Sequence, residues 1–290
     1  MTYTRHEGSF EGFDQNRLFY QSWTQPHPKA RIVLTHGQGE HSDCYGRLIQ
    51  YFESKNIDFY SYDLRGHGKS EGLRGYAADF HDYVKDTLIF YDLIRKKVGT
   101  KVPLIALGHS MGGLIQTLAL LEGEQNKFTS QILSAPLFGV AVKVPVIKDK
   151  AARWLHQLMP KLTLGNEIDY SMLSRDPDVI REYEKDYLRH NRISSGVYLG
   201  FTREFETVAQ RAQEIQLPTM MVVAERDPVI DSLACENFFE KISSTNKRIR
   251  IYGQESKHEL FNDTVRKDVF SDVELFLKEQ TEVENANSIS

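Results

Sequence analysis

Cysteine is scarce in this chain: Cys44 and Cys235 are the only two among 290 residues. They lie far apart in the sequence and form no C-x-x-C or other zinc-ligand spacing, so we predict neither a disulfide framework nor a structural zinc site. Scarce cysteine favours reduced thiols in a cytoplasmic setting. We expect both residues to act as small, buried apolar side chains, which is the commoner case for a free cysteine.

Long apolar runs and a surplus of positive charge are also missing. No segment reaches the roughly 18 apolar residues of a membrane-spanning helix, and the first residues, MTYTRHEGSFEGFDQ, lack the charged and then apolar plan of a secretory signal. The formal net charge is −4, and no block rich in lysine and arginine occurs, which argues against nucleic acid as a partner. The sequence predicts a cytoplasmic protein that at most lies peripherally on a membrane surface.

Short apolar runs do recur, and they alternate with segments of helix length. The strand-like runs are RIVLTHG, IDFYSYD, PLIALGHS, SQILSAP, TMMVVAERD and KRIRIYG. Strands that alternate with helices favour an α/β fold with a mostly parallel sheet and helices on both faces. Helices are predicted over residues 78–98 and directly after Ser110. Near the N-terminus, SFEGF and LFYQSW flank a short polar turn and predict a hairpin.

The alternation of strands and helices stops after SQILSAP for much longer than a usual crossover. We therefore predict a helical cap inserted at residues 137–205. Residues 1–136 and 206–290 would form the core, and residues 281–290, which are polar and lie at the chain end, would form a flexible tail.

The predicted cap is basic and amphipathic. We expect helices within it and at its C-terminal border over residues 147–159, 179–190 and 196–216. Between residues 137 and 165 the charged side chains are Lys143, Lys148, Asp149, Lys150, Arg153 and Lys161. In the first helix one apolar face could combine Ile147, Ala151, Trp154, Leu155, Leu158 and Met159. This face either packs on the core or also meets lipid, and the sequence leaves both interpretations open.

Ser110 is a candidate nucleophile because it follows the apolar residues of the run LIALGHSMGGL. Gly108 and Gly112 flank Ser110 in the pattern G-x-S-x-G. This pattern between a strand and a helix is typical of a nucleophile elbow, because the glycines permit a tight turn that exposes the serine Oγ. The helix that follows directs N–H groups and the positive end of its dipole toward the same place. We therefore predict Ser110 as the nucleophile.

A serine nucleophile needs a base and a carboxylate that orients the base, and in this kind of fold they follow in the order serine, acid, histidine. TMMVVAERDPVID offers Glu225, Asp227 and Asp231. We choose Asp227, because the proline after it fixes a turn, whereas Asp231 suits the N-cap of the next helix. His258 follows the final strand. Ser110, Asp227 and His258 are thus predicted to form a catalytic triad.

The remaining requirement is a pair of donors for an oxyanion. One is predicted to be the N–H of Met111, and the other a backbone N–H of the loop HGQGEH, whose glycines let the chain turn its amides inward. His36, Glu40 and His41 in this loop miss the spacings H-E-x-x-H and H-x-x-E-H. We therefore predict no metal and no cofactor.

Together these motifs resemble the α/β-hydrolase superfamily and, within it, the monoacylglycerol lipase and bacterial lysophospholipase L2 group. The resemblance covers nearly the whole chain through HGQGEHSDCY, DLRGHGKSEG, GHSMGGLI, AERDPVID and the spacing to His258. In the cap, MPKLTLGNEIDYSMLSRD resembles the monoacylglycerol lipases, whereas SAPLFGVAVKVP and YLRHNRISSGVYLGFTRE are closer to lysophospholipase L2. The resemblance implies the α/β-hydrolase fold, with a sheet of about eight strands.

The same resemblance implies a function and further site residues. Gln38 would supply the second oxyanion donor, and Glu40 would lie where the polar head of a monoacylglycerol binds. A position that holds a basic head-group contact in monoacylglycerol lipases is Cys44 here. The implied activity is a serine esterase that releases a fatty acid, through an acyl-enzyme, from a lipid with one acyl chain, either a lysophospholipid or a monoacylglycerol.

Two alternatives remain. A fold alone does not set the substrate, so the chain could be an aminopeptidase or a small-ester hydrolase. It could also be a non-catalytic binding protein that keeps the fold and uses the cap as an interaction surface.

Overall fold

The computed structural model describes residues 2–141 and 146–287, and most of its strands form one sheet. The strands of this sheet are β1 (Thr4–Glu11), β2 (Arg17–Thr24), β3 (Ala30–Thr35), β4 (Ile57–Tyr62), β5 (Leu104–His109), β6 (Ser130–Ser134), β9 (Thr219–Ala224) and β10 (Lys247–Tyr252). Their order across the eight-stranded sheet is β1-β2-β4-β3-β5-β6-β9-β10. β1 and β2 form the predicted antiparallel hairpin, β2 is also antiparallel to β4, and the other neighbours are parallel. The mostly parallel sheet predicted from the apolar runs is confirmed.

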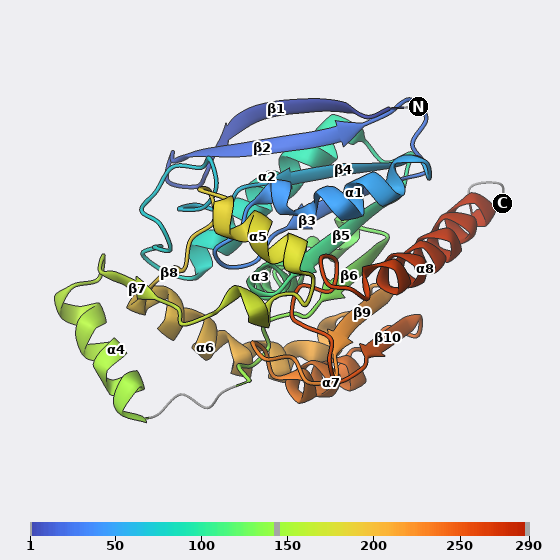
Figure 1. Ribbon diagram of the computed structural model, residues 1–290. Coiled ribbons are helices and arrows are strands. Elements are labelled where there is room, and N and C mark those ends of the chain that lie inside the picture. The colour runs from blue at the N-terminus through green and yellow to red at the C-terminus, as the bar shows by residue number, and fades with distance from the viewer. Residues whose placement is uncertain (1, 142–145, 288–290) are drawn as a thin grey trace.

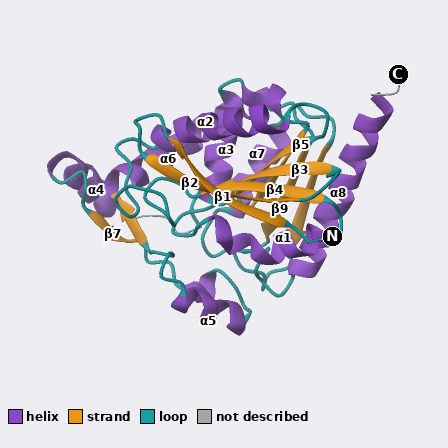
Figure 2. Cartoon of the chain, turned by 90° about the horizontal axis from the view of Figure 1, so that it is seen from above, coloured by secondary structure: helices purple, strands orange, loops and turns teal. Residues whose placement is uncertain are grey.

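Helices cover both faces of this sheet (Figures 1 and 2). The α-helices are α1 (Gly46–Glu53), α2 (His81–Val98), α3 (Met111–Leu121), α4 (Val146–Leu158), α5 (Pro177–Lys185), α6 (Ser195–Arg211), α7 (Ser232–Lys241) and α8 (Arg266–Asn287). Short 3-10 turns lie at Ser42–Tyr45, Glu124–Lys127, Tyr170–Met172 and Ala212–Glu214. One buried cluster joins the sheet to α2, α3, α6 and α7, and the other joins it to α1 and α8. The two clusters are the core of the protein.

The strands in the middle of the sheet are apolar because both of their faces are covered. Every residue of β4, β5, β6 and β9 is buried, as expected for strands between two helical layers. The edge strand β10 differs, since Arg248 and Arg250 alternate with apolar residues and the strand is partly exposed. Charged residues on an edge strand discourage pairing with another chain.

The insertion between β6 and β9 holds α4, α5 and a two-stranded antiparallel sheet of β7 (Thr163–Gly165) and β8 (Arg192–Ser194). Figure 1 shows α4 and β7 projecting from one end of the molecule, with α5 on its near side. The three helices expected in this region are present, although α5 ends at Lys185 rather than near residue 190. It ends there because Asp186 is extended and its side chain accepts the N–H of Leu188. The small sheet of β7 and β8 was not predicted.

The border predicted for the cap lies within a helix and stays a prediction. The expected boundary between residues 205 and 206 falls inside the continuous helix α6. Val197, Phe201 and Val208, from both sides of this boundary, are buried in the same core cluster. Since α6 packs on the core along its length, the expected boundary does not separate two packing units.

The apolar face predicted for the first cap helix is largely exposed. Trp154 is 62%, Leu158 59% and Met159 52% exposed, and Ala151 is also exposed, whereas Leu155 is half-buried. The interpretation that this face packs entirely on the core is therefore wrong for these residues. Lys143 and the side chains of Ile147, Lys148 and Asp149 lie outside the described residues. Within the described ranges, no helix is both long and apolar enough to cross a bilayer.

The C-terminal segment also departs from the prediction, because α8 continues through Asn287 where we expected a tail from residue 281. Buried Val273, Phe276, Leu277 and Gln280 anchor the preceding turns of this helix, and each further residue of an established helix adds one hydrogen bond. Residues 288–290 of the predicted tail lie outside the described part of the chain.

Candidate active site

Ser110 occupies a strained turn between β5 and α3. Its φ of 52° and ψ of −123° lie where an L residue is rarely found. A Cβ on Gly108 would lie 2.7 Å from Gly113 Cα, and a Cβ on Gly112 would lie 2.2 Å from the carbonyl oxygen of Thr35. Only glycine fits at these two positions, so G-x-S-x-G is required by the packing of the turn. The turn places Ser110 at the carboxyl end of a central parallel strand, where ligands bind in such sheets.

The structure brings together the three residues predicted as a triad. His258 Nε2 lies 2.8 Å from Ser110 Oγ, and His258 Nδ1 lies 2.8 Å from Asp227 Oδ2. The other carboxylate oxygen of Asp227 accepts the N–H groups of Val229 and Ile230 at 2.8 and 3.1 Å. A tautomer that donates Nδ1–H to Asp227 leaves Nε2 free to accept the Ser110 proton, which is the arrangement of a general base.

Charges around this histidine favour its protonated form. Burial lowers the pKa of His258, but the charge and hydrogen bond of Asp227 outweigh burial and raise that pKa overall. Burial raises the pKa of Asp227, yet His258 and the two backbone donors hold it below its ordinary value. The neighbouring His109 is different, because burial and the His258 charge lower its pKa to about 3. Positive charge therefore forms on His258, beside Asp227, and not on His109.

The loop after β3 is held in place by its own glutamate. Glu40 Oε1 accepts the N–H of Gly37 at 2.5 Å and the hydroxyl of Tyr45 at 2.7 Å. Burial and the nearby charge of Glu259 raise the pKa of Glu40 to about 7, although Arg189 opposes them. Glu40, predicted as a head-group residue, is thus buried and also shapes the loop.

A segment of the cap holds the same loop from outside. The carbonyl of Gly39 accepts the N–H of His190 at 2.9 Å, and Gln38 Nε2 donates to the carbonyl of Arg192 at 2.7 Å. The approach is so close that a Cβ on Gly39 would lie 2.2 Å from the His190 carbonyl oxygen. The conformation of the loop is therefore tied to the position of the cap.

The two predicted oxyanion donors belong to residues near the nucleophile. Gln38 lines the same cavity as Ser110. Met111 is the first residue of α3, so its N–H is among the four that have no partner within the helix. Their role as donors stays a prediction.

A buried polar cluster that we did not predict from the sequence lies beside the triad. The guanidinium of Arg189 contacts both oxygens of Glu259 at 3.1 Å and lies 3.7 Å from Glu40 Oε2. It also lies 3.6 Å from the centre of the Tyr183 ring, and the Tyr183 hydroxyl donates to Glu259. Burial raises the pKa of Glu259, but Arg189 and its other partners hold it at about 2.

No local pattern could have predicted this pairing. Arg189 and Glu259 are 70 positions apart, and each follows a segment that could have ended in solvent. The one signal in the sequence is the position of Glu259 directly after His258.

The cavity that contains Ser110 is small, with a volume of about 40 Å³. Its lining includes Ser110, Gln38 and His258 from the core and Tyr170, Leu173 and Arg189 from the insertion. Pockets that hold small molecules usually measure about 300–1,000 Å³. The insertion thus leaves little space beside the predicted nucleophile.

The loop residues considered for a metal do not converge. His36 Nδ1 lies 2.8 Å from the carbonyl of Gly37, and its Nε2 accepts the N–H of Leu64. Among the described residues, the group whose ligand atoms lie close enough to share an ion is His41, Cys44 and Asp186. His41 Nε2 already contacts Asp186 at 2.8 Å, and the positive charge of Arg189 acts on Cys44, which disfavours a cation.

Comparisons with known proteins give a consistent result. The profile of a family described as "Serine aminopeptidase, S33" matches residues 26–265. The monoglyceride lipase of Homo sapiens is 30% identical over 275 residues, which cover 92% of this chain and 89% of that protein. An uncharacterized abhydrolase domain-containing protein of Dictyostelium discoideum is 30% identical over 96% of this chain, which spans 29% of that longer relative.

A solved structure agrees with these relatives. The crystal structure of a monoacylglycerol lipase from Paleococcus ferrophilus superposes with a TM-score of 0.77 at 27% identity, covering 97% of this chain and 99% of that one. The similarity therefore extends over the sheet, its helices and the insertion.

Proposed function

Because this chain belongs to the serine aminopeptidase S33 family of α/β-hydrolases and is a carboxylic ester hydrolase, we propose that it hydrolyses lipids that carry one acyl chain. The predicted family and fold class are confirmed, and membership of an enzyme family sets aside the non-catalytic alternative. A relative called a monoglyceride lipase supports the lipid class. Within that class the substrate is a monoacylglycerol or a lysophospholipid.

The observation that carries this proposal is the chain of two 2.8 Å hydrogen bonds from Ser110 through His258 to Asp227. His258 takes the proton of Ser110 as Oγ attacks the ester carbonyl, and Asp227 stabilises the imidazolium. The N–H groups of Gln38 and Met111 hold the oxyanion. His258 then gives its proton to the departing alcohol, which leaves an acyl-enzyme on Ser110. Water, deprotonated by the same histidine, releases the fatty acid.

We assign the choice of substrate to residues 137–205, acting as a cap. Ile168, Tyr170 and Leu173 line the cavity together with Ser110 and would contact the acyl chain when the cap opens. Each methylene that leaves water contributes about 0.8 kcal/mol, so affinity should rise with chain length.

The exposed face of α4 supports peripheral contact with a membrane. Trp154, Leu158 and Met159 on this segment are exposed, and Lys150 and Arg153 lie next to them in the sequence. Exposed apolar side chains with basic neighbours suit the surface of an anionic bilayer.

A matched panel of substrates tests the function. The same acyl chain is offered on glycerol, on phosphocholine, on phosphoethanolamine and on p-nitrophenol, alongside an aminoacyl p-nitroanilide. We expect fatty-acid release from at least one lipid, and loss of that release in Ser110→Ala. Cleavage of the anilide with no activity on any lipid would favour the aminopeptidase, and full lipase activity in Ser110→Ala would overturn the mechanism.

A further inference from the structure

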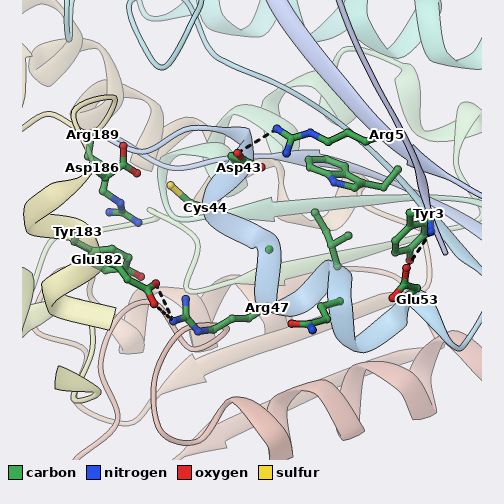
Figure 3. A pocket seen from close by; sticks show the side chains of 14 residues that line it. Tyr3, Arg5, Asp43, Cys44, Arg47, Glu53, Glu182, Tyr183, Asp186 and Arg189 are labelled. Carbon is green, nitrogen blue, oxygen red and sulfur yellow. Dashed lines mark hydrogen bonds and ion pairs between the residues drawn. The ribbon is translucent and has the colours of Figure 1, made fainter. Parts of the chain in front are cut away.

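One cap side chain carries a positive charge into the cavity of Ser110. Arg189 follows α5, yet its side chain is only 3% exposed, and it lines the cavity together with Ser110, Glu40 and Glu259. Cys44 lines a second, wider groove, and Arg189 lines that groove as well. Figure 3 shows Arg189 extending from the cap toward Cys44, above Tyr183. Arg189 thus lies between the groove and the cavity.

The hydrogen bonds of Arg189 leave one donor unused. Nη1 and Nη2 contact Glu259, whereas Nε has no hydrogen-bond partner among the described residues although it is buried. A buried guanidinium N–H without a partner is costly. It is also a donor that a ligand in this cavity could satisfy.

A carboxylate oxygen of Glu40 lies near another nitrogen of the same guanidinium. Glu40 uses Oε1 for Gly37 and Tyr45, but its Oε2 stands 3.7 Å from Arg189 Nη2, which is too long for a hydrogen bond. A hydroxyl group can donate one hydrogen bond and accept another. A hydroxyl between the two side chains would therefore accept from Arg189 and donate to Glu40.

The charge of the cluster decides which head group fits. One guanidinium faces two carboxyl groups, and Glu259 already pairs with it through both oxygens. A phosphate brought to this place would meet Glu40 and Glu259 with little positive charge left to offset them, and like charges at close range repel. An uncharged head with hydroxyl groups brings no such penalty.

We propose that Arg189 is a specificity-determining residue of this hydrolase and that, with Glu40, it binds an uncharged, hydroxyl-bearing alcohol head of the substrate. The inference rests on the proposed lipid esterase function and names its head group as a polyol rather than a phosphodiester. The core residue beside the guanidinium is Cys44, which lines the same groove, so the positive charge of this subsite comes from the cap.

The chain offers a matched control for Arg189. Arg47 on α1 pairs with Glu182 on α5 at 2.8 Å, so it also joins the core to the cap through an arginine and a glutamate (Figure 3). Arg47 lies outside the Ser110 cavity. Arg47→Lys therefore tests whether any weakened contact between cap and core has the same effect.

The experiment compares kcat/KM on monooleoylglycerol, methyl oleate and oleoyl-lysophosphatidylcholine in the parent, Arg189→Lys, Glu40→Gln and Arg47→Lys. Lysine keeps the charge but loses the planar fork. Losing one hydrogen bond to a charged group lowers kcat/KM about tenfold or more. We expect this loss on monooleoylglycerol, mainly through KM, for Arg189→Lys and Glu40→Gln, and a smaller loss on methyl oleate, whose alcohol carries no further hydroxyl. Arg47→Lys should leave kcat/KM on monooleoylglycerol and on methyl oleate unchanged. The parent should have a higher kcat/KM on monooleoylglycerol than on the lysophospholipid.

Each contrary result has a distinct meaning. Equal losses on monooleoylglycerol and methyl oleate, or no loss on either, would overturn the head-group role, as would a parent that prefers the lysophospholipid. The rate at which a fluorophosphonate labels Ser110 reports an intact triad independently of the head group. If Ser110 of Arg189→Lys is labelled more slowly than Ser110 of the parent, the result for Glu40→Gln decides whether the head-group role holds. A parent that hydrolyses none of the three oleoyl esters would overturn the proposed function itself.

Discussion

The predicted triad and the cap hold their side chains in contrasting ways. Ser110, Asp227 and His258 are all buried, each follows a strand of one sheet, and hydrogen bonds fix every member. The described part of α4 instead exposes Trp154 and Leu158. The contrast separates two tasks. Chemistry needs atoms fixed to within fractions of an ångström, whereas the selection and entry of a lipid need a part that can move.

Several contacts tie these two regions together near the nucleophile, and among them the backbone N–H groups of His258 and Glu259 donate to the carbonyls of Met172 and Leu173. The cap meets the loop after β3 through Gln38 and Gly39, and it meets the segment after His258 through Arg189 and Glu259. Both meeting points lie next to predicted catalytic groups. Movement of the cap would therefore change the substrate site without unfolding the sheet beneath it.

The largest expected effect comes from the core. Ser110→Ala should lower ester hydrolysis by about 10⁴-fold or more, because the members of a triad act as a unit. Stability should change little, since alanine keeps the Cβ that the turn already accommodates. The measurements are fatty-acid release and thermal unfolding. A variant that kept a tenth of the parental turnover would show that the chemistry lies elsewhere.

Next in size is the pH dependence of the same site. His258 must be neutral to accept the Ser110 proton, and Asp227 raises its pKa above the ordinary 6.5. Activity should therefore be full at alkaline pH and fall about tenfold per pH unit below that raised pKa. The pH profile of kcat/KM on a p-nitrophenyl ester measures this pKa. A midpoint below 6.5 would contradict the effect assigned to Asp227.

A smaller effect tests the close packing of the elbow. Gly112→Ala places a Cβ 2.2 Å from the Thr35 carbonyl oxygen, so it should lower the free energy of unfolding by about 1–3 kcal/mol. Gly46→Ala is the control, because a Cβ there meets nothing within 4 Å and its φ is −53°. That change should stabilise α1 by about 0.5–1 kcal/mol. Urea unfolding measures the free energy of unfolding of both variants. Equal changes in the two variants would contradict the close packing assigned to Gly112.

The smallest effect on stability is expected in the cap. Replacing the exposed Trp154 and Leu158 by serine should change the free energy of unfolding by less than about 0.5 kcal/mol per site. Phe80→Ala, in the core, should cost about 3–5 kcal/mol. The cap variant should nonetheless bind anionic vesicles less well while its p-nitrophenyl ester activity stays unchanged. A large loss of stability would mean that this face is packed, and would erase the contrast between the two regions.

Much of the fold could be predicted because its signals are local. Buried parallel strands appear as short apolar runs, and the elbow needs glycine at positions 108 and 112 for reasons confined to a few residues. The order of Ser110, Asp227 and His258 followed from their places after strands. The end of the cap was harder to predict, since α6 has the same helical period on both sides of residue 205, and only its packing on the core shows where it belongs.

The sequence by itself determined the sheet, the elbow and the three residues that meet at its carboxyl edge, because strand period and turn chemistry act over short distances. Only the tertiary structure decided that Arg189 pairs with Glu259 beside Glu40, and that Trp154 and Leu158 of α4 lie in solvent. Both outcomes depend on how the cap docks on the core, and docking is set by the burial and charge of side chains far apart in the chain.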